Sequence, residues 1–130
     1  MIRIVVMGHG GYAEGVRQNL GMIAGESEAM CFVDLTREDD LADFENRVKQ
    51  LLEGFGEDEV LFACDLLGAS PFRVAAMLCA ANPGRYYTVA GLNTMAFLEL
   101  CLNGEEGLSV EAMANRAIET TRASVARFPE

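Results

Sequence analysis

The single histidine of the chain, His9, lies in a glycine-rich stretch that reads GHGGY over Gly8–Tyr12. The preceding apolar run, Ile2–Met7, is typical of a strand that is covered on both faces. His9 is therefore expected at the carboxyl end of a buried strand. Neutral imidazole is a good nucleophile near neutral pH, which makes His9 a candidate for nucleophilic chemistry. The alternative is a structural histidine, because GHGG is a weaker signal than a GxGxxG dinucleotide-binding motif.

A second stretch with chemical potential is DLLGASPF, Asp65–Phe72. It connects a predicted strand to a predicted helix, with Ser70 as the N-cap and Pro71 at the first helical position. The free N–H groups and the positive dipole end of such a helix attract anions, and phosphate suits them. The alternative is an ordinary helix cap, with Asp65 in a turn. The residues predicted to bind phosphate are Gly10, Gly68, Ala69 and Ser70.

Strands and helices alternate along the chain, and the pattern predicts an α/β fold. The predicted strands are Ile2–Met7, Met30–Leu35, Glu59–Cys64 and Tyr86–Ala90. The predicted helices are Ala13–Ala24, Asp39–Phe55, Ser70–Ala81, Thr94–Asn103 and Ser109–Arg122. We expect one domain over residues 1–130, a flavodoxin-like doubly wound sheet of four parallel strands in the order 2-1-3-4 with helices on both faces.

This topology brings His9 and Asp65 together. In the order 2-1-3-4 the switch point lies between strands 1 and 3, and ligands bind there, outside the carboxyl ends of the strands. A carboxylate that accepts a hydrogen bond from one ring nitrogen fixes the tautomer and leaves the other nitrogen free to attack. His9, Asp65 and the helix start thus predict phosphoryl transfer through histidine, with no metal and no cofactor required if the donor is a phosphoprotein.

The composition limits the partners and the compartment. A formal net charge of −10 disfavours binding to nucleic acid and to anionic lipid, and favours basic protein partners. No apolar run reaches about 18 residues and no signal-peptide layout is present, so we expect a cytoplasmic protein. The four cysteines lack CxxC spacing and are expected to be reduced core residues rather than disulfides or metal ligands.

At these positions the chain resembles the EIIA domain of the mannose-type sugar phosphotransferase system. The resemblance rests on Gly8-His9-Gly10, on Asp65 with the turn Gly68–Phe72, and on Gly91-Leu92-Asn93, and it covers essentially the whole chain. It implies that His9 accepts a phosphoryl group from the phosphocarrier HPr and passes it to an EIIB subunit, which serves the membrane components EIIC and EIID. It also implies that Asp65 orients the imidazole.

The same resemblance implies a homodimer in which about Ser124–Phe128 adds an antiparallel C-terminal edge strand. The amino-acid sequence of the motifs is most similar to that of the N-acetylgalactosamine branch. Leu67, Ala69 and Met95 depart from the residues that are common in the family. The sugar stays open, because EIIA does not touch it.

Other functions remain as alternatives. The phosphocarrier subunit of a dihydroxyacetone kinase has a related domain, and a regulatory phosphorylation sensor would need no transporter. A response-regulator receiver is disfavoured, because it needs an acidic pair after strand 1 and a later lysine, whereas the single lysine here is Lys49. A flavin-binding module is disfavoured by the lack of hydroxyl-rich loops at the switch point.

Overall fold

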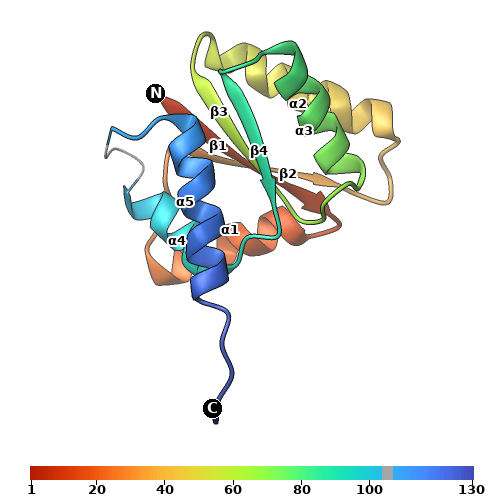
Figure 1. Ribbon diagram of the computed structural model, residues 1–130. Helices are drawn as coiled ribbons and strands as arrows, with labels where there is room; N and C mark the ends of the chain where they lie inside the picture. The colour runs from red at the N-terminus through yellow and green to blue at the C-terminus, as the bar shows by residue number, and fades with distance from the viewer. Residues whose placement is uncertain (104–106) are drawn as a thin grey trace.

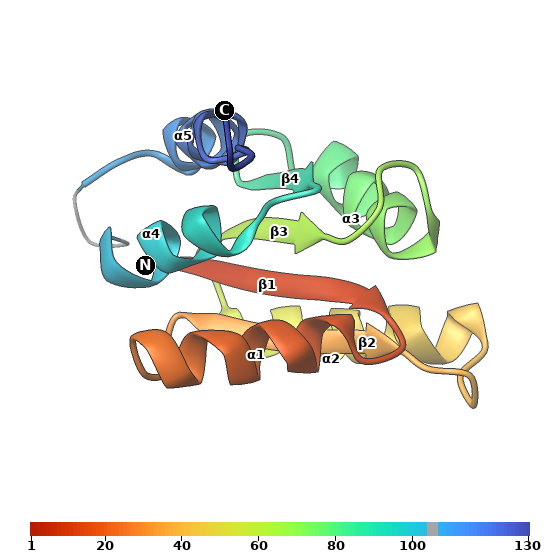
Figure 2. The same ribbon diagram turned by 90° about the horizontal axis from the view of Figure 1, so that it is seen from below.

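The computed structural model describes residues 1–103 and 107–130 as alternating strands and helices around one sheet (Figure 1). The strands are β1 (Ile2–His9), β2 (Met30–Leu35), β3 (Glu59–Cys64) and β4 (Tyr86–Ala90). The helices are α1 (Tyr12–Ile23), α2 (Leu41–Phe55), α3 (Ser70–Ala81), α4 (Thr94–Asn103) and α5 (Val110–Ala123). All neighbouring strands pair in parallel in the order β2-β1-β3-β4, as Figure 2 shows. The predicted doubly wound sheet is confirmed.

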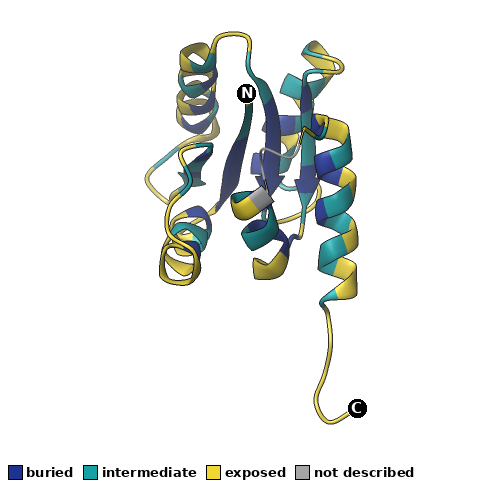
Figure 3. Cartoon of the chain, turned by 90° about the vertical axis from the view of Figure 1, so that its left-hand side faces the viewer, coloured by how far each residue is buried: buried dark blue, intermediate teal, exposed yellow. Residues whose placement is uncertain are grey.

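The two faces of the sheet are covered by different helices. In β1, Ile4 and Val6 point to the layer of α1, α4 and α5, and Val5 and Met7 point to the layer of α2 and α3. Every residue from Ile4 to Met7 is buried, which explains why the strand is apolar without alternation. Figure 3 shows the buried strands between helices whose outer surfaces are exposed.

The helices begin where local capping favours them. In α2, the side chain of Asp40 accepts a hydrogen bond from the backbone N–H of Asp43 at 2.8 Å, and the Asp43 carboxylate accepts one from the Asp40 N–H at 3.2 Å. This reciprocal capping box satisfies two N–H groups that the first turn leaves without partners. In α5, Ser109 accepts a hydrogen bond from the N–H of Ala112 at 3.1 Å.

The structure corrects two local predictions. β1 continues two residues past the apolar run to His9, because the pairing with β2 extends to His9 opposite Leu35. The N-cap of α3 is Ala69, not Ser70, whose side chain makes no capping hydrogen bond. The C-terminal edge strand, predicted for a dimer, is not seen in the single chain: Ser124 ends α5 as its C-cap, and residues 125–130 extend away from the domain as exposed chain (Figure 3).

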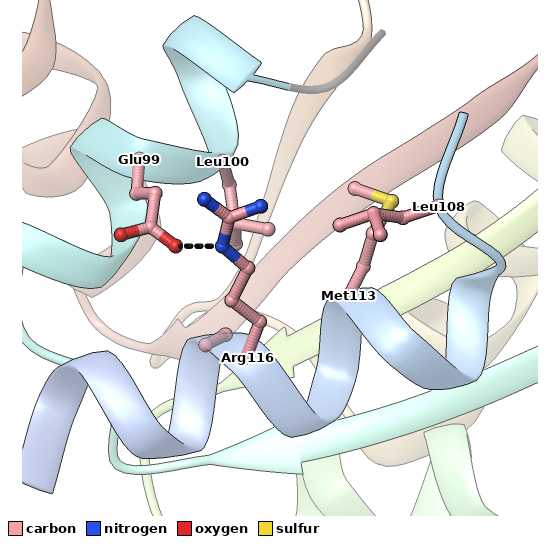
Figure 4. A pocket seen from close by; sticks show the side chains of 6 residues that line it. Glu99, Leu100, Leu108, Met113 and Arg116 are labelled. Atoms are coloured by element: carbon pink, nitrogen blue, oxygen red, sulfur yellow. Dashed lines mark ion pairs between the residues drawn. The ribbon is translucent and has the colours of Figure 1, made fainter. Parts of the chain in front are cut away.

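A small cavity of about 10 Å³ lies between α4 and α5, on the face that also carries α1 (Figure 4). Glu99 of α4 and Arg116 of α5 form an ion pair at its mouth, with Arg116 Nε 2.8 Å from Glu99 Oε1. A volume of this size is at the lower limit for a single water molecule, so we interpret it as a packing gap between two helices. No helix among the described residues is long and apolar enough to cross a membrane.

Candidate active site

His9 is the last residue of β1, and its side chain is 45% exposed. Its ring Nδ1 lies 2.7 Å from Oδ2 of Asp65, and its backbone N–H donates a hydrogen bond to the same oxygen at 2.9 Å. One carboxylate oxygen therefore fixes both the backbone and the ring of His9. The structure thus brings His9 and Asp65 together at the switch point, as the sequence predicts.

The backbone and the side chain of Asp65 both contact β1. It follows β3 directly, and its own backbone N–H donates to the carbonyl of Met7 in β1 at 3.1 Å. Its side chain is 15% exposed, and the second oxygen, Oδ1, is buried without a hydrogen-bond partner among the described residues. Oδ2 is thus the oxygen that binds His9.

The environment keeps Asp65 ionised. Its partial burial alone would raise the pKa of the carboxyl group, but the hydrogen bonds from the ring and the backbone of His9 outweigh this and lower the pKa below its usual value. An ionised carboxylate accepts hydrogen bonds only, so Nδ1 of a neutral His9 ring must carry the proton. Nε2 is then the unprotonated nitrogen, on a side chain that solvent and a partner protein can reach.

Tyr12 packs beneath the histidine turn, and Gly8 leaves the space for it. A Cβ atom at Gly8 would lie 2.5 Å from Cδ2 of the Tyr12 ring, well inside any normal contact. Burial raises the pKa of Tyr12 to about 12, with a further rise from the negative charge of Asp65. The first glycine of GHGGY therefore serves ring packing. The second, Gly10, has a φ of 64° and makes the turn out of the strand.

Asp34 at the end of β2 was missed by the sequence analysis. Its carboxylate accepts hydrogen bonds from the N–H groups of Ala13 at 2.8 Å and of Glu14 at 3.1 Å, which are the second and third residues of α1. The local N-cap, Gly11, has no side chain that can do this. Asp34 is thus a cap supplied from a neighbouring strand. A capping prediction that scans only the residues next to the helix start does not find it.

The loop from β3 to α3 carries the predicted phosphate-binding residues. Gly68 has a φ of 81°, a conformation that favours glycine. The N–H groups of Gly68, Ser70 and Phe72 have no hydrogen-bond acceptor among the described residues, as expected for a helix start. The N–H of Ala69, by contrast, donates to Leu66 O at 3.2 Å.

Gly10 does not present its amide to this loop. Its N–H donates to Leu35 O in β2 at 2.9 Å, so the structure places Gly10 beside the site and uses its N–H elsewhere. The third motif, Gly91-Leu92-Asn93, follows β4 at the same edge. Asn93 Oδ1 accepts from the Ala96 N–H at 3.2 Å and its Nδ2 donates to Ser124 Oγ at 2.8 Å, so the asparagine joins the start of α4 to the end of α5.

The thiol next to the site is not a competing nucleophile. Cys64 immediately precedes Asp65, and burial raises the pKa of its thiol to about 12. The thiol is therefore protonated near neutral pH, and only the thiolate is strongly nucleophilic. In residues 1–103 and 107–130 all four cysteines are free, and no group of three or more potential metal ligands is present.

Comparisons with known proteins agree with this geometry. The EIIA-man family model, described as "PTS system fructose IIA component", matches residues 3–120. The chain is 29% identical over 116 residues to the PTS system fructose-specific EIIA component of Bacillus subtilis (strain 168), covering 88% of this chain and 78% of that protein. It is 28% identical over 125 residues to the PTS system mannose-specific EIIAB component of Escherichia coli (strain K12), covering 95% of this chain and 38% of that protein.

Solved structures give the same result. The mannose/sorbose specific IIA subunit of the phosphotransferase system from Enterococcus faecalis superposes with a TM-score of 0.88 at 27% identity, covering 98% of this chain and 95% of that one. The phosphotransferase system component EIIA from Streptococcus agalactiae has the same fold, with a TM-score of 0.89 at 24% identity over 98% of both chains. The chain therefore belongs to the EIIA-man family and is a phosphotransfer component of a sugar phosphotransferase system.

Proposed function

We propose that Nε2 of His9 accepts a phosphoryl group from the phosphohistidine of HPr and passes it to a histidine of an EIIB subunit, so that the chain is a protein-histidine phosphotransferase. The observation that carries this proposal is the 2.7 Å contact between His9 Nδ1 and Asp65 Oδ2, which leaves Nε2 unprotonated and accessible. In each transfer one P–N bond breaks and another forms, and the Nδ1 proton stays in its hydrogen bond. The attacking ring becomes more positive as the new bond forms, and the Asp65 carboxylate stabilises that charge.

The loop before α3 is the proposed cradle for the phosphoryl oxygens. The N–H groups of Gly68, Ser70 and Phe72 are the donors that lack acceptors there, and the positive end of the α3 dipole adds to their effect. Ala69 and Gly10, also predicted to bind phosphate, have N–H groups that are already engaged. In this proposal they shape the two loops, and Ala69 keeps the helix start free of a bulky side chain.

The partners follow from this role. HPr is the proposed donor and an EIIB subunit the proposed acceptor, with EIIC and EIID reached only through EIIB. Because HPr is a cytoplasmic carrier, the proposed site of action is cytoplasmic. The names of the relatives mention fructose, mannose and sorbose. These sugars are stated for those proteins and not for this chain.

We also propose that the chain is a homodimer in which residues 125–128, from the predicted segment Ser124–Phe128, pair with β4 of a second copy. β4 is an edge strand, and a groove of about 320 Å³ lies beside it, lined by residues of α3, β4 and α5. The segment that would occupy it is extended and exposes Val125 and Phe128. An added strand would cover both the open edge and these apolar side chains.

The dimer is tested by sedimentation of the whole chain at micromolar concentration. We expect a dimer for the wild type and dissociation when Phe128 and Val125 are both replaced by Asp. A wild-type monomer contradicts the proposal.

The transfer role is tested by incubation with phosphoenolpyruvate, enzyme I and HPr, followed by a search for an acid-labile, alkali-stable adduct. His9→Ala should abolish labelling, because the chain has no second histidine. Folding of the variant is checked by circular dichroism, since the exposed ring contributes little to the core. Undiminished labelling of folded His9→Ala would rule out His9 as the acceptor.

A further inference from the structure

The turn that joins His9 to α1 has little rigidity of its own. It consists of Gly10 and Gly11, and glycine has no side chain to limit the conformations of its backbone. Gly11 is the N-cap of α1 and makes no side-chain capping hydrogen bond. A nucleophile has to keep its position within a fraction of an ångström for efficient transfer. Groups outside the turn must therefore hold it in place.

The end of β2 holds the first half of the turn. Leu35 lies opposite His9 in the sheet, and its carbonyl accepts a hydrogen bond from the N–H of Gly10 at 2.9 Å. This is a backbone contact, so any residue at position 35 can make it. It fixes the chain directly after His9, whereas Gly11 and the start of α1 depend on another group.

Asp34, the residue before Leu35, holds the second half of the turn. Its two carboxylate oxygens are each used once: Oδ1 accepts a hydrogen bond from the N–H of Ala13 at 2.8 Å, and Oδ2 accepts one from the N–H of Glu14 at 3.1 Å. The side chain lies between β2 and α1 and is partly buried. Two bonds to consecutive N–H groups fix both the place and the direction of the helix start.

Tyr12 connects the start of α1 to the strand that carries His9. It is the first residue of α1, and its ring lies against Gly8, where an added Cβ atom would be 2.5 Å from Cδ2 of the ring. Burial raises the pKa of Tyr12 to about 12, and the charges of Asp65 and Asp34 raise it further, so this side chain lies near both carboxylates. A shift of the helix start would move the ring and the residue before His9.

We propose that Asp34 is a positioning residue for phosphoryl transfer, which holds the start of α1 so that the His9 ring keeps its hydrogen bond to Asp65. The inference rests on the proposed function. β1 lies between β2 and β3, so the histidine turn is held from both neighbouring strands, by Asp34 from β2 and by Asp65 after β3 (Figure 2). Asp34 acts through the helix start and does not touch the phosphoryl group. Its loss should slow the transfer step without weakening binding of the donor protein.

The test compares Asp34→Ala and Asp34→Asn in single-turnover transfer from phosphorylated HPr. Alanine removes both hydrogen bonds, and transfer should slow about tenfold, because a 1 Å displacement of a reacting group costs up to about 100-fold. Asparagine has one side-chain oxygen and can replace only one of the two bonds, so its loss should be smaller, about threefold. Binding of unphosphorylated HPr, measured by isothermal titration calorimetry, should equal that of the wild type in both variants.

Asp40→Ala is the matched control. It also removes an aspartate that caps a helix, since the Asp40 side chain accepts a hydrogen bond from the N–H of Asp43 at 2.8 Å, but this helix is α2, on the other face of the sheet from α1. It should lower the urea midpoint and leave transfer unchanged. The ¹⁵N shifts of the His9 ring need no phosphoryl donor. Asp34→Ala should lower the fraction of rings protonated at Nδ1, and Asp40→Ala should not.

The outcomes separate this inference from the proposed function. A phosphorylated wild type, together with a folded Asp34→Ala variant that transfers as fast as Asp40→Ala, overturns the inference alone. Weaker HPr binding by Asp34→Ala that accounts for all of its slower transfer also overturns it, because Asp34 then acts on docking. If Asp34→Ala does not fold, Asp34→Asn decides, and a wild-type rate with wild-type His9 shifts overturns the inference. A wild type that takes no phosphoryl group overturns the proposed function, and the His9 shifts of the variants then show whether Asp34 positions the ring.

Discussion

Replacing Asp65 by Asn is the sharpest test of the site, because the change removes a charge and keeps the shape. Asp65 Oδ2 accepts two hydrogen bonds from His9, from the ring at 2.7 Å and from the backbone at 2.9 Å. An asparagine can turn either its oxygen or its NH₂ group toward the ring. With the NH₂ group facing Nδ1, the proton of a neutral ring moves to Nε2, which then has no lone pair for attack.

The expected loss of phosphoryl-transfer rate in Asp65→Asn lies at the lower end of the range for removal of an orienting carboxylate. Removal of such a group from a buried triad costs about 10⁴-fold in rate. Here the His9 side chain is 45% exposed, so water competes for Nδ1 and screens the charge that Asp65 supplies. We therefore expect phosphoryl transfer to slow by about 100-fold, which corresponds to about 2.7 kcal/mol of transition-state stabilisation.

The assay is single-turnover transfer from phosphorylated HPr, together with ¹⁵N chemical shifts of the His9 ring. In the wild type the shifts should identify a protonated Nδ1, and in Asp65→Asn a mixture of tautomers or a protonated Nε2. Asp39→Asn is the control, because it also removes an aspartate charge at this edge of the sheet, where Asp39 pairs with Arg47. Transfer at the wild-type rate by a folded Asp65→Asn variant would refute the assignment of Asp65 as the orienting residue.

Three further predictions concern stability and are measured by urea unfolding. Gly8→Ala should cost about 1–3 kcal/mol, because the added methyl group overlaps the Tyr12 ring, and an unchanged midpoint would contradict this packing. Ser109→Ala should cost about 1 kcal/mol through loss of the α5 cap, whereas Ser70→Ala should be nearly neutral; equal costs would show that the capping assignment is wrong. The pKa of Asp65 is lowered on folding, so its contribution to stability is complete above the unfolded-state value of about 3.9 and is lost as the pH falls through the folded value. The stability gap between wild type and Asp65→Asn should accordingly narrow at acidic pH, and a constant gap would argue against an ionised Asp65.

The fold could be predicted because its signals are long and redundant. The residues of β1 that enter the two cores alternate along one apolar run, which is typical of a strand between two helical layers. Four such strands separated by helices leave few topologies open. The predicted ends of the strands are less accurate, because a strand ends where its pairing with the neighbouring strand ends, and composition does not show this. β1 includes Gly8 and His9 since β2 continues beside them.

The catalytic pair could be predicted for the same topological reason. The carboxyl ends of β1 and β3 are adjacent in the sheet, so residues that follow the two strands meet whatever lies between them in sequence. The sequence gives no comparable signal for Asp34, because its role depends on the distance from the end of β2 to the start of α1. That distance is a property of the assembled sheet, and it is not encoded in any local pattern around α1.

The wrong prediction of the α3 cap, Ser70 in place of Ala69, bears on function. A serine before a proline predicts a side-chain cap, yet the extended cap position falls on Ala69, with a ψ of 177°. A capping side chain accepts a hydrogen bond from the N–H of the second or third helical residue. With alanine at that place, the N–H of Phe72 has no acceptor among the described residues. The sequence feature that weakens the cap is thus the one that leaves a donor free for an anion, and a serine or aspartate at position 69 should occupy that donor and weaken anion binding.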